Sequence, residues 1–483
     1  MSLIQRFVSA LLILSLAFTS LHANDLPELG DVASNELSLA TEKKIGQQII
    51  NEIRWRDPAY LDDPDVEAYL NQLGGQLAAA SNDPGLGFYF FLINDQSINA
   101  FAMPGGYIGV HVGLILSAQS ESELAGVLAH EISHVTQRHI SRQLYNSKQV
   151  GMASMLAMGL ALLAARSSGQ VAGAAIVGAQ AGAISSQLAF SRDFEREADR
   201  MGFDTLSRAG FDVRGMGGFF ERLQKSVRLY ENNATVYLRT HPLTGERLSD
   251  MQNREQAVAY RQVADSPEFL LTRAKLRAMQ GTAQEAISDF EGLLRDKKYS
   301  SEWAAYFGLS VALARHRDWP AAESALLNAK KFTVASAMLE RQLAEIKLAQ
   351  GDSVRAMVLY DEAMLRYPLN LALIYGNGEA LIKLRRFGAA LNFCEAQLRN
   401  HPQDVRLHKM RAESYAGLGR IALQHLALSE VFALQGQTAG AIEQLQFARS
   451  AGDANFYEQS AIDARLRELQ KRLADEHQEK RNW

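Results

Sequence analysis

Residues 120–140 of this chain read SESELAGVLAHEISHVTQRHI, and this stretch decides which fold the sequence can adopt. Ser120 and Glu123 form a capping box, in which the serine side chain bonds the amide three residues on and the glutamate reaches back. A helix is therefore predicted to begin at Ser120 and to continue to about Ile140. Its middle turns, LAGVLAHEISHV, are mostly apolar, which indicates that the helix is buried in a domain core.

Two histidines, His130 and His134, lie four residues apart and share one face of this predicted helix. Neutral imidazoles at this spacing can hold one zinc ion at about 2.0–2.1 Å, and Glu131 beside them can act as a general base toward water. The pattern H-E-x-x-H is typical of zinc metalloproteases, although it arises by chance in roughly one or two of every hundred chains of this length. The alternative is a pair of buried core histidines, which would be costly without a charged partner.

A catalytic zinc ion also needs a third protein ligand and an open position for water. Residues 191–200, SRDFEREADR, predict a second helix on which Glu195 and Asp199 share a face. One carboxylate could bind the metal while the other holds a histidine ring, although the segment alone would equally suit a solvated helix with ion pairs. His139 is predicted to be structural or exposed, because it falls on the opposite side of a continuous helix from His130.

In combination these motifs resemble the HtpX-like and CAAX-prenyl-protease-like zinc metallopeptidases, which are gluzincins. The resemblance covers about residues 99–247 and is carried by NAFAMPGGYIGV, HEISH, EREAD and HPLTGERL. It implies that Glu195 is the third zinc ligand and that Asp199 belongs to the catalytic site. It also implies that His241 lies near the metal and stabilises the oxyanion. Two alternatives for His241 are a plain loop histidine and a reversible block of the open zinc position.

The segment before the capped helix predicts a small antiparallel sheet. Aromatic and β-branched runs at residues 88–93, 98–103 and 107–112 are separated by turn residues. Helices are predicted at residues 35–54 and 65–80, and they dominate after the sheet. The predicted fold class is therefore mainly α: an α+β gluzincin metallopeptidase domain with a small antiparallel sheet, followed by an α-solenoid.

The solenoid is predicted from a repeat in the last 200 or so residues. Ala322, Ala356 and Ala390 are spaced by 34 residues each time and lie in the same apolar frame. Two helices per 34 residues that touch through small side chains are typical of tetratricopeptide (TPR) repeats, whose concave surface binds other proteins. Residues 406–474 are predicted to form an irregular continuation and cap. The alternative is a plain helical bundle.

The composition excludes several classes of protein. Hydrophobic residues make up 47% of the 483 residues and charged residues 22%, so the chain is globular and not disordered. With 50 basic and 54 acidic side chains, the formal charge of -4 argues against a nucleic-acid partner. The single cysteine, Cys394, cannot form an intramolecular disulfide, so stability must come from apolar cores.

The N-terminus is predicted to direct export. Arg6, an apolar run over residues 7–18 and the small residue Ala23 form a secretory signal peptide, with an uncleaved membrane anchor as the alternative. The predicted domains are a signal peptide (1–23), a zinc metallopeptidase domain (24–262) and a TPR domain with an irregular cap (263–483). Apolar, small-residue stretches within residues 150–184 could form a packed helical hairpin or a lid that touches a membrane surface.

These features predict an exported, zinc-dependent endopeptidase with one Zn²⁺ ion per chain. It would work in the periplasm, and any contact with a membrane would be peripheral. It would cleave unfolded or misassembled polypeptides, and these could pair with an edge strand within residues 99–110. The resemblance implies that outer-membrane β-barrel precursors are its substrates and that their assembly complex docks on the TPR groove. The alternatives are a non-catalytic TPR chaperone or adaptor with a structural metal, and a different zinc hydrolase such as an aminopeptidase.

Overall fold

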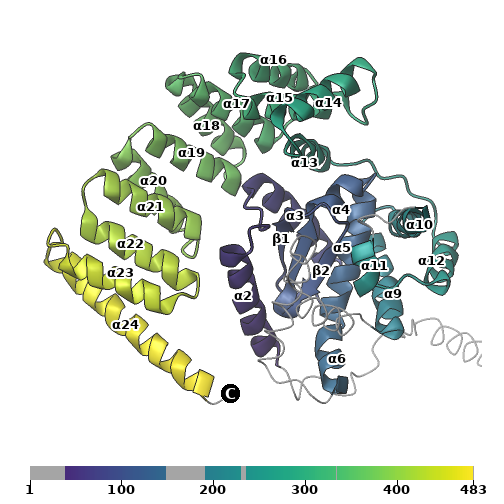
Figure 1. The fold of residues 1–483 in the computed structure, drawn as a ribbon, viewed down its shortest axis with the longest axis horizontal. Coiled ribbons are helices and arrows are strands. Elements are labelled where there is room, and N and C mark those ends of the chain that lie inside the picture. The colour runs from purple at the N-terminus through teal and green to yellow at the C-terminus, as the bar shows by residue number, and fades with distance from the viewer. Residues whose placement is uncertain (1–37, 148–190, 230–234, 333, 482–483) are drawn as a thin grey trace, which may run out of the picture.

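The computed structural model of the chain describes residues 38–147, 191–229, 235–332 and 334–481 (Figure 1). An N-terminal unit with a small sheet is followed by a curved array of paired helices. The predicted signal peptide and the apolar stretches within residues 150–184 lie outside the described residues. In the part of the chain that is described, no helix is both long enough and apolar enough to cross a membrane.

The predicted fold class, mainly α with a small sheet, is confirmed. The N-terminal unit contains, in order, α2 (Leu39–Arg56), α3 (Pro64–Ala79), β1 (Tyr89–Ile93), β2 (Ala100–Met103), β3 (Tyr107–His111), α4 (Val112–Ser117), α5 (Glu121–Thr136), α6 (His139–Ser147), α9 (Arg192–Arg208), α10 (Arg214–Leu229), α11 (Thr235–Thr240) and α12 (Gly245–Ala257). A short 3-10 helix, η2 (Pro104–Gly106), joins β2 to β3. The core of this unit lies between the sheet, α3, α5 and α10.

The sheet is mixed and has the strand order β1-β3-β2, so the prediction that all its strands are antiparallel is wrong. The strands β2 and β3 form the expected antiparallel hairpin, but β1 runs parallel to β3. The reason lies in residues 94–99, which do not form a tight turn. Asn94 donates to the Ala59 carbonyl at 2.7 Å and Gly113 donates to the Asp95 carbonyl at 2.9 Å, so this segment is anchored as a crossing loop. It carries the chain past β3 and leaves β2 at the edge.

The helix α5 ends at Thr136, four residues before the predicted end at Ile140. Gln137 caps it, and Arg138 adopts a positive φ of 52°, a conformation that L-residues seldom take and that no helix interior allows. The chain therefore turns before α6 begins at His139. Nothing in the residue types of this junction signals a break.

The C-terminal unit is built from helix pairs, which Figure 1 shows as an arc around one side of the N-terminal unit. Its helices are α13 (Pro267–Ala278), α14 (Ala283–Arg295), α15 (Glu302–Arg315), α16 (Trp319–Lys330), α17 (Ala337–Ala349), α18 (Ser353–Arg366), α19 (Leu371–Lys383), α20 (Phe387–Leu398), α21 (Val405–Gly417), α22 (Ile421–Leu434), α23 (Thr438–Ser450) and α24 (Phe456–Arg481). The three repeating alanines, Ala322, Ala356 and Ala390, lie on the second helices of successive pairs and are fully buried. Larger side chains there would separate the paired helices, which explains the 34-residue period.

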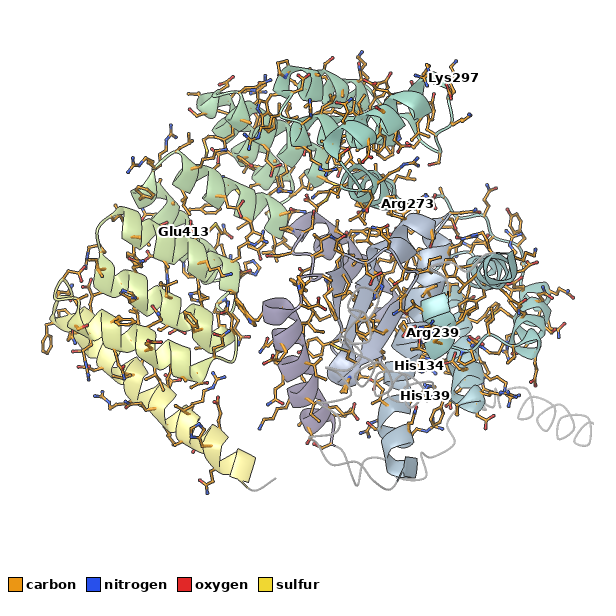
Figure 2. All side chains as sticks on the ribbon, in the orientation of Figure 1. His134, His139, Arg239, Arg273, Lys297 and Glu413 are labelled. Atoms are coloured by element: carbon orange, nitrogen blue, oxygen red, sulfur yellow. The ribbon has the colours of Figure 1, made fainter. Side chains whose placement is uncertain are left out.

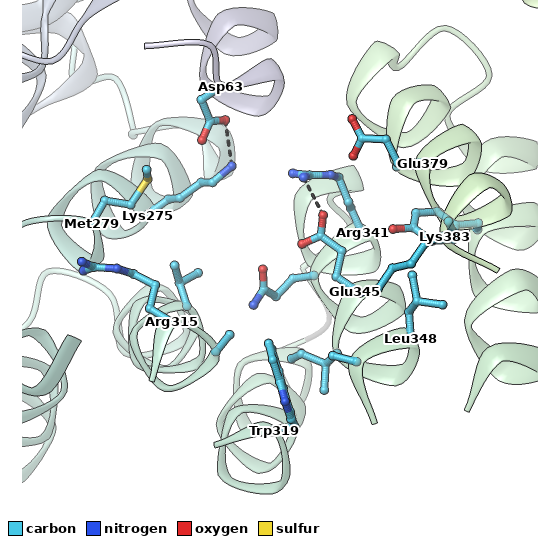
Figure 3. Close-up of a pocket in the computed structure, with 18 residues that line it drawn as sticks. Asp63, Lys275, Met279, Arg315, Trp319, Arg341, Glu345, Leu348, Glu379 and Lys383 are labelled. Atoms are coloured by element: carbon cyan, nitrogen blue, oxygen red, sulfur yellow. Dashed lines mark hydrogen bonds and ion pairs between the residues drawn. The ribbon is translucent and has the colours of Figure 1, made fainter. Parts of the chain in front are cut away.

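The two units are joined by ion pairs between the start of α3 and the inner side of the arc. The Asp65 carboxylate accepts from Lys275 Nζ at 2.6 Å and also pairs with Arg341. Lys275 bonds Asp63 as well, at 2.7 Å. Figure 3 shows the cavity of about 560 Å³ beside these pairs, with Trp319 among its lining residues. The acidic turn of the first unit therefore reaches into the concave side of the solenoid.

We expect Asp65→Asn to destabilise the folded chain by about 1–3 kcal/mol, because Lys275 and Arg341 would each lose a buried carboxylate partner and keep only Asp63 and Glu345, respectively. Chemical denaturation measures the loss. Asp62→Asn is the matched control, since that side chain is 61% exposed and its pair with Arg406 should contribute no more than about 1 kcal/mol. Equal stabilities of the two variants would show that this junction does not hold the units together.

Candidate active site

The helix α5 fixes the position of both histidines of the HEISH motif. Ser120 caps it as predicted, because its Oγ accepts from the Glu123 amide at 3.3 Å. The Glu123 carboxylate bonds the amide of Gln119, one residue before the predicted partner, at 2.6 Å. Every side chain from Glu121 to His134 is buried. The imidazoles thus project from a helix that is enclosed by the core on all sides.

The helix α9 brings the carboxylates of EREAD to this helix. Ser191 caps α9 by accepting from the Phe194 amide at 3.2 Å. Gly202 allows the close approach, since a Cβ atom there would lie only 3.1 Å from His130 Cα. About two turns and one turn before this contact, Glu195 and Asp199 face α5 and are almost completely buried.

Four side chains converge on one point. His130 Nε2 lies 3.0 Å from His134 Nε2 and 3.5 Å from a Glu195 carboxylate oxygen. Glu195 also lies 3.4 Å from His134 Nε2 and 3.0 Å from His241 Nδ1. The ring of His241, just after α11, lies 3.3 Å from His130 Nε2. The sequence prediction that these residues meet therefore agrees with their positions.

This cluster suits a divalent metal ion. One ligand atom from each of its four side chains lies within 4.8 Å of the others, and all four side chains are buried. Ligand nitrogens about 2.0–2.1 Å from a tetrahedral ion would be about 3.3 Å apart, which is close to the separations in this cluster. Three imidazoles and one carboxylate are also donor types that suit such a site.

Asp199 and Arg247 form the layer behind the metal-binding cluster. Asp199 Oδ1 lies 3.0 Å from His130 Nδ1, on the side of the ring that faces away from the cluster. Arg247 donates to both Asp199 oxygens, at 2.6 and 2.7 Å, and lies 2.7 Å from Glu195 Oε2. The guanidinium thus compensates two buried carboxylates at once and fixes both of them. No role for Arg247 was predicted, although it belongs to the HPLTGERL motif.

His139 lies outside the group of four clustered side chains, and of the two predicted alternatives, structural or exposed, the exposed one is wrong. It is fully buried, and its Nδ1 lies 2.9 Å from His134 Nδ1. Both residues are labelled in Figure 2. Its Nε2 lies 3.3 Å from Glu197, and its ring stacks on Phe194 with centroids 4.5 Å apart. The turn at Arg138 ends the helix and redirects the ring. His139 therefore contacts the outer nitrogen of His134 in the way that Asp199 contacts that of His130.

Glu131 lies between the metal-binding cluster and the edge strand β2. Its Oε2 accepts from the Ala102 amide at 3.1 Å, while Oε1 lies 3.5 Å from His241 Nε2 and has no hydrogen-bond partner among the described residues. Burial raises the pKa of the Glu131 carboxyl above its ordinary value. A carboxylate with a raised pKa and one free oxygen is suited to accept a proton.

The two motif histidines differ in protonation. Burial alone would lower the pKa of His130, but hydrogen bonds to Asp199 and Glu195 raise it to about 9. Burial holds the pKa of His134 well below its usual value. Burial also opposes ionisation of Glu195, but the His241 charge and the hydrogen bonds from the histidines keep its pKa well below normal. Without a metal the cluster thus holds a proton on His130 beside an ionised Glu195.

Comparison with known proteins agrees with this geometry. The profile of Peptidase family M48 matches residues 64–255, and a tetratricopeptide repeat profile matches residues 347–413. The chain is 30% identical over 447 residues to a putative beta-barrel assembly-enhancing protease of Vibrio cholerae, with 92% of each chain covered. It is 31% identical over 460 residues to the beta-barrel assembly-enhancing protease of Escherichia coli K12, with 93% of each chain covered.

The fold and the site define a metallopeptidase of the M48 class joined to TPR repeats. Within that class, the chain belongs to the family of beta-barrel assembly-enhancing proteases.

We expect metal binding to release protons and to strengthen as the pH rises. His130 is protonated below about pH 9 in the metal-free site, and a metal ligand must be deprotonated. Between about pH 7 and 9, affinity should therefore increase with pH and then level off. Calorimetric titration of the apoprotein with zinc, in two buffers of different protonation enthalpy, measures the protons released. Affinity that does not change over this range would contradict the protonated state of His130.

We expect His139→Ala to weaken metal binding by about 10- to 100-fold, because His134 would lose the partner that orients its ring. Competition with a fluorescent chelator measures the affinity. His408→Ala is the matched control, since His408 is a buried histidine of the solenoid and should leave metal affinity unchanged. If both variants bind metal as tightly as the parent, His139 does not position His134.

Proposed function

We propose that this chain is a zinc-dependent endopeptidase of the periplasm that acts on unfolded or misassembled polypeptides. The observation that carries the proposal is the convergence of four buried metal-ligand side chains beside Glu131, which has a free carboxylate oxygen. Membership of a protease family supports the reaction class. We also propose domain boundaries of residues 24–262 for the peptidase and 263–483 for the solenoid, a division supported by the start of α13 at Pro267.

In this proposal His130, His134 and Glu195 hold one Zn²⁺ ion. The ion, when bound, supplies Lewis-acid polarisation of the scissile carbonyl and a lowered pKa for water. Asp199 and His139 hold the outer nitrogens of the two motif histidines, which fixes the rings and their tautomers. Asp199 thus acts on the reaction through His130.

Glu131 is proposed as the general base and acid. Its free Oε1 would accept a proton from the attacking water and would later donate that proton to the departing amine. The Ala102 amide holds Oε2, so the carboxylate keeps one oxygen fixed and the other available. This arrangement also ties the base directly to the strand along which substrate is proposed to lie.

We propose that His241 closes the site at rest. Its Nδ1 lies among the other metal-ligand atoms, where a fourth ligand would stand in place of water. Displacement of this ring would open the position and leave the imidazole beside the reacting carbonyl, where it could stabilise the oxyanion. Tyr237 stacks on the ring with centroids 4.6 Å apart and would set the energy needed to move it.

Substrate is proposed to add to the edge of the sheet. The strand β2 has β3 on one side only, and its Ala102 faces Glu131. An extended polypeptide that pairs main chain to main chain along β2 would be held with little dependence on sequence. Unfolded or misassembled polypeptides offer such segments, whereas folded proteins do not.

The solenoid is proposed to hold substrate or a partner complex. Its inner cavity, shown in Figure 3, combines apolar walls at Trp319 and Leu348 with the charged groups of Arg341 and Glu345. The relatives are named for enhancing β-barrel assembly. We therefore propose outer-membrane β-barrel precursors as substrates, their assembly complex as the partner, and the predicted signal peptide as the route to the periplasm.

The second candidate is a non-catalytic TPR chaperone or adaptor with a structural metal. The specific observation in its favour is His241, because four protein ligands are typical of closed, structural zinc sites. The two candidates differ in whether the water position ever opens, and they make opposite predictions for cleavage.

We expect Glu131→Gln to reduce cleavage of an unfolded protein, such as reduced and alkylated casein, by about 10²- to 10⁴-fold while zinc content stays unchanged. The amide cannot accept the proton of the attacking water. Mass spectrometry of the fragments and metal analysis of the same samples measure both quantities. Glu246→Gln is the matched control, because that glutamate is near the site but 71% exposed.

Equal cleavage by the parent and Glu131→Gln would remove Glu131 from the base role. No cleavage by the zinc-loaded parent, together with undiminished binding of unfolded protein, would favour the adaptor. Fragments that arise only from chain ends would indicate an aminopeptidase instead.

A further inference from the structure

A second, smaller cavity lies on the other side of α13 from the one in Figure 3. It has a volume of about 330 Å³ and is bounded by α13, the end of α14, the start of α15 and Leu116 at the end of α4. Four of its lining side chains are apolar: Phe290 is buried, and Leu116, Leu270 and Leu293 are partly buried. The cavity therefore has room for roughly one large side chain and its main-chain atoms.

The charges around this cavity have one sign. Arg273, Arg277 and Lys298 line it, and no acidic side chain does so among the described residues. Arg277 is already paired with Asp289, with contacts of 2.6 and 2.8 Å. Lys298 is 75% exposed, and its Nζ lies 3.4 Å from a carboxylate oxygen of Asp296 in the same loop. Arg273 forms no ion pair among the described residues, and its guanidinium carbon lies 5.3 Å from the centroid of the Phe269 ring, a cation–π contact.

The environment of the Arg273 guanidinium is energetically unfavourable for a charged group. Its Nε is buried and has no hydrogen-bond partner, and the described part of the chain gives it no ion pair. Burial lowers the pKa of the guanidinium, and the acids that act against this, Asp265 and Glu123, do so only from a distance. Both are engaged elsewhere, since Asp265 accepts from the Glu121 amide and Glu123 pairs with Arg222. A half-buried cation in this state favours an anionic ligand.

Hydrogen-bond donors other than the basic side chains also face the cavity. Ser300 and Ser301 line it, and Ser301 is the N-cap of α15. The first turn of α15 therefore borders the cavity, and its helix dipole adds to the attraction for a negative charge. Figure 2 labels Arg273 on α13, where the solenoid meets the first unit.

We propose that this cavity binds the C-terminal residue of a polypeptide, with its carboxylate on Arg273 and its apolar side chain against Leu270 and Phe290. A chain end brings a carboxylate and an apolar side chain together in one residue and needs only one strand to enter. An internal aspartate or glutamate would need room for main chain on both sides, and its side chain would not fill the apolar wall. The proposal does not depend on the metal or on cleavage.

The test is a binding titration with the full chain carrying Glu131→Gln, so that the probe stays intact. The probe is a fluorescein-labelled octapeptide of serine and glycine that ends in phenylalanine with a free carboxylate. Two further peptides separate the sources of the anion: the same sequence with a C-terminal amide, and an amidated sequence with one internal glutamate. Fluorescence anisotropy measures each affinity, and mass spectrometry checks that the probe is uncut.

We expect the free-carboxylate peptide to bind at least tenfold more tightly than either amidated peptide, and Arg273→Gln to remove at least tenfold of that affinity. Arg295→Gln is the matched control, because this arginine is 75% exposed and outside the cavity. Lys298→Gln changes only an exposed lining residue and should weaken binding by a smaller factor even if Arg273→Gln folds poorly. Equal binding of the free acid and the amide, or no effect of Arg273→Gln and Lys298→Gln in folded protein, would overturn the proposal.

Discussion

The approach of α9 to α5 is the constraint on which the rest of the site depends. Gly202 lets the two helices come close enough for Glu195 and Asp199 to reach the imidazoles of α5. A larger residue would separate the helices by a few tenths of an ångström, and the contacts between the carboxylates and the histidines would lengthen. Longer contacts would satisfy these buried polar groups less well, which destabilises a core.

A network of buried charged groups surrounds the metal-binding cluster. Arg247 pairs with both Asp199 and Glu195, and the histidines contact the same two carboxylates. Such a network is stable only when it is complete, because removal of one member leaves the others desolvated and unpaired. A divalent cation would complete it from the inside, as Arg247 does from the outside. The site is therefore rigid for the same reason that it can bind metal.

The same rule governs the junction of the two units, where Asp65 meets Lys275 and Arg341. The metal-binding cluster and the solenoid are held by separate sets of ion pairs. The concave side of the solenoid is thus turned toward the peptidase, which keeps a polypeptide bound there close to the unit that would act on it (Figure 1).

The local elements could be predicted from residue order alone: the capped helix with His130 and His134, the helix with Glu195 and Asp199, and the 34-residue repeat, because each rests on spacing within one helix or one repeat. The contacts between elements could not be predicted in this way. The order β1-β3-β2 depended on where the crossing loop is anchored, and the place of His139 depended on a positive φ at Arg138. Neither is encoded in residue periodicity, because both arise from contacts between segments distant in the chain or from a backbone conformation that the side chain does not favour.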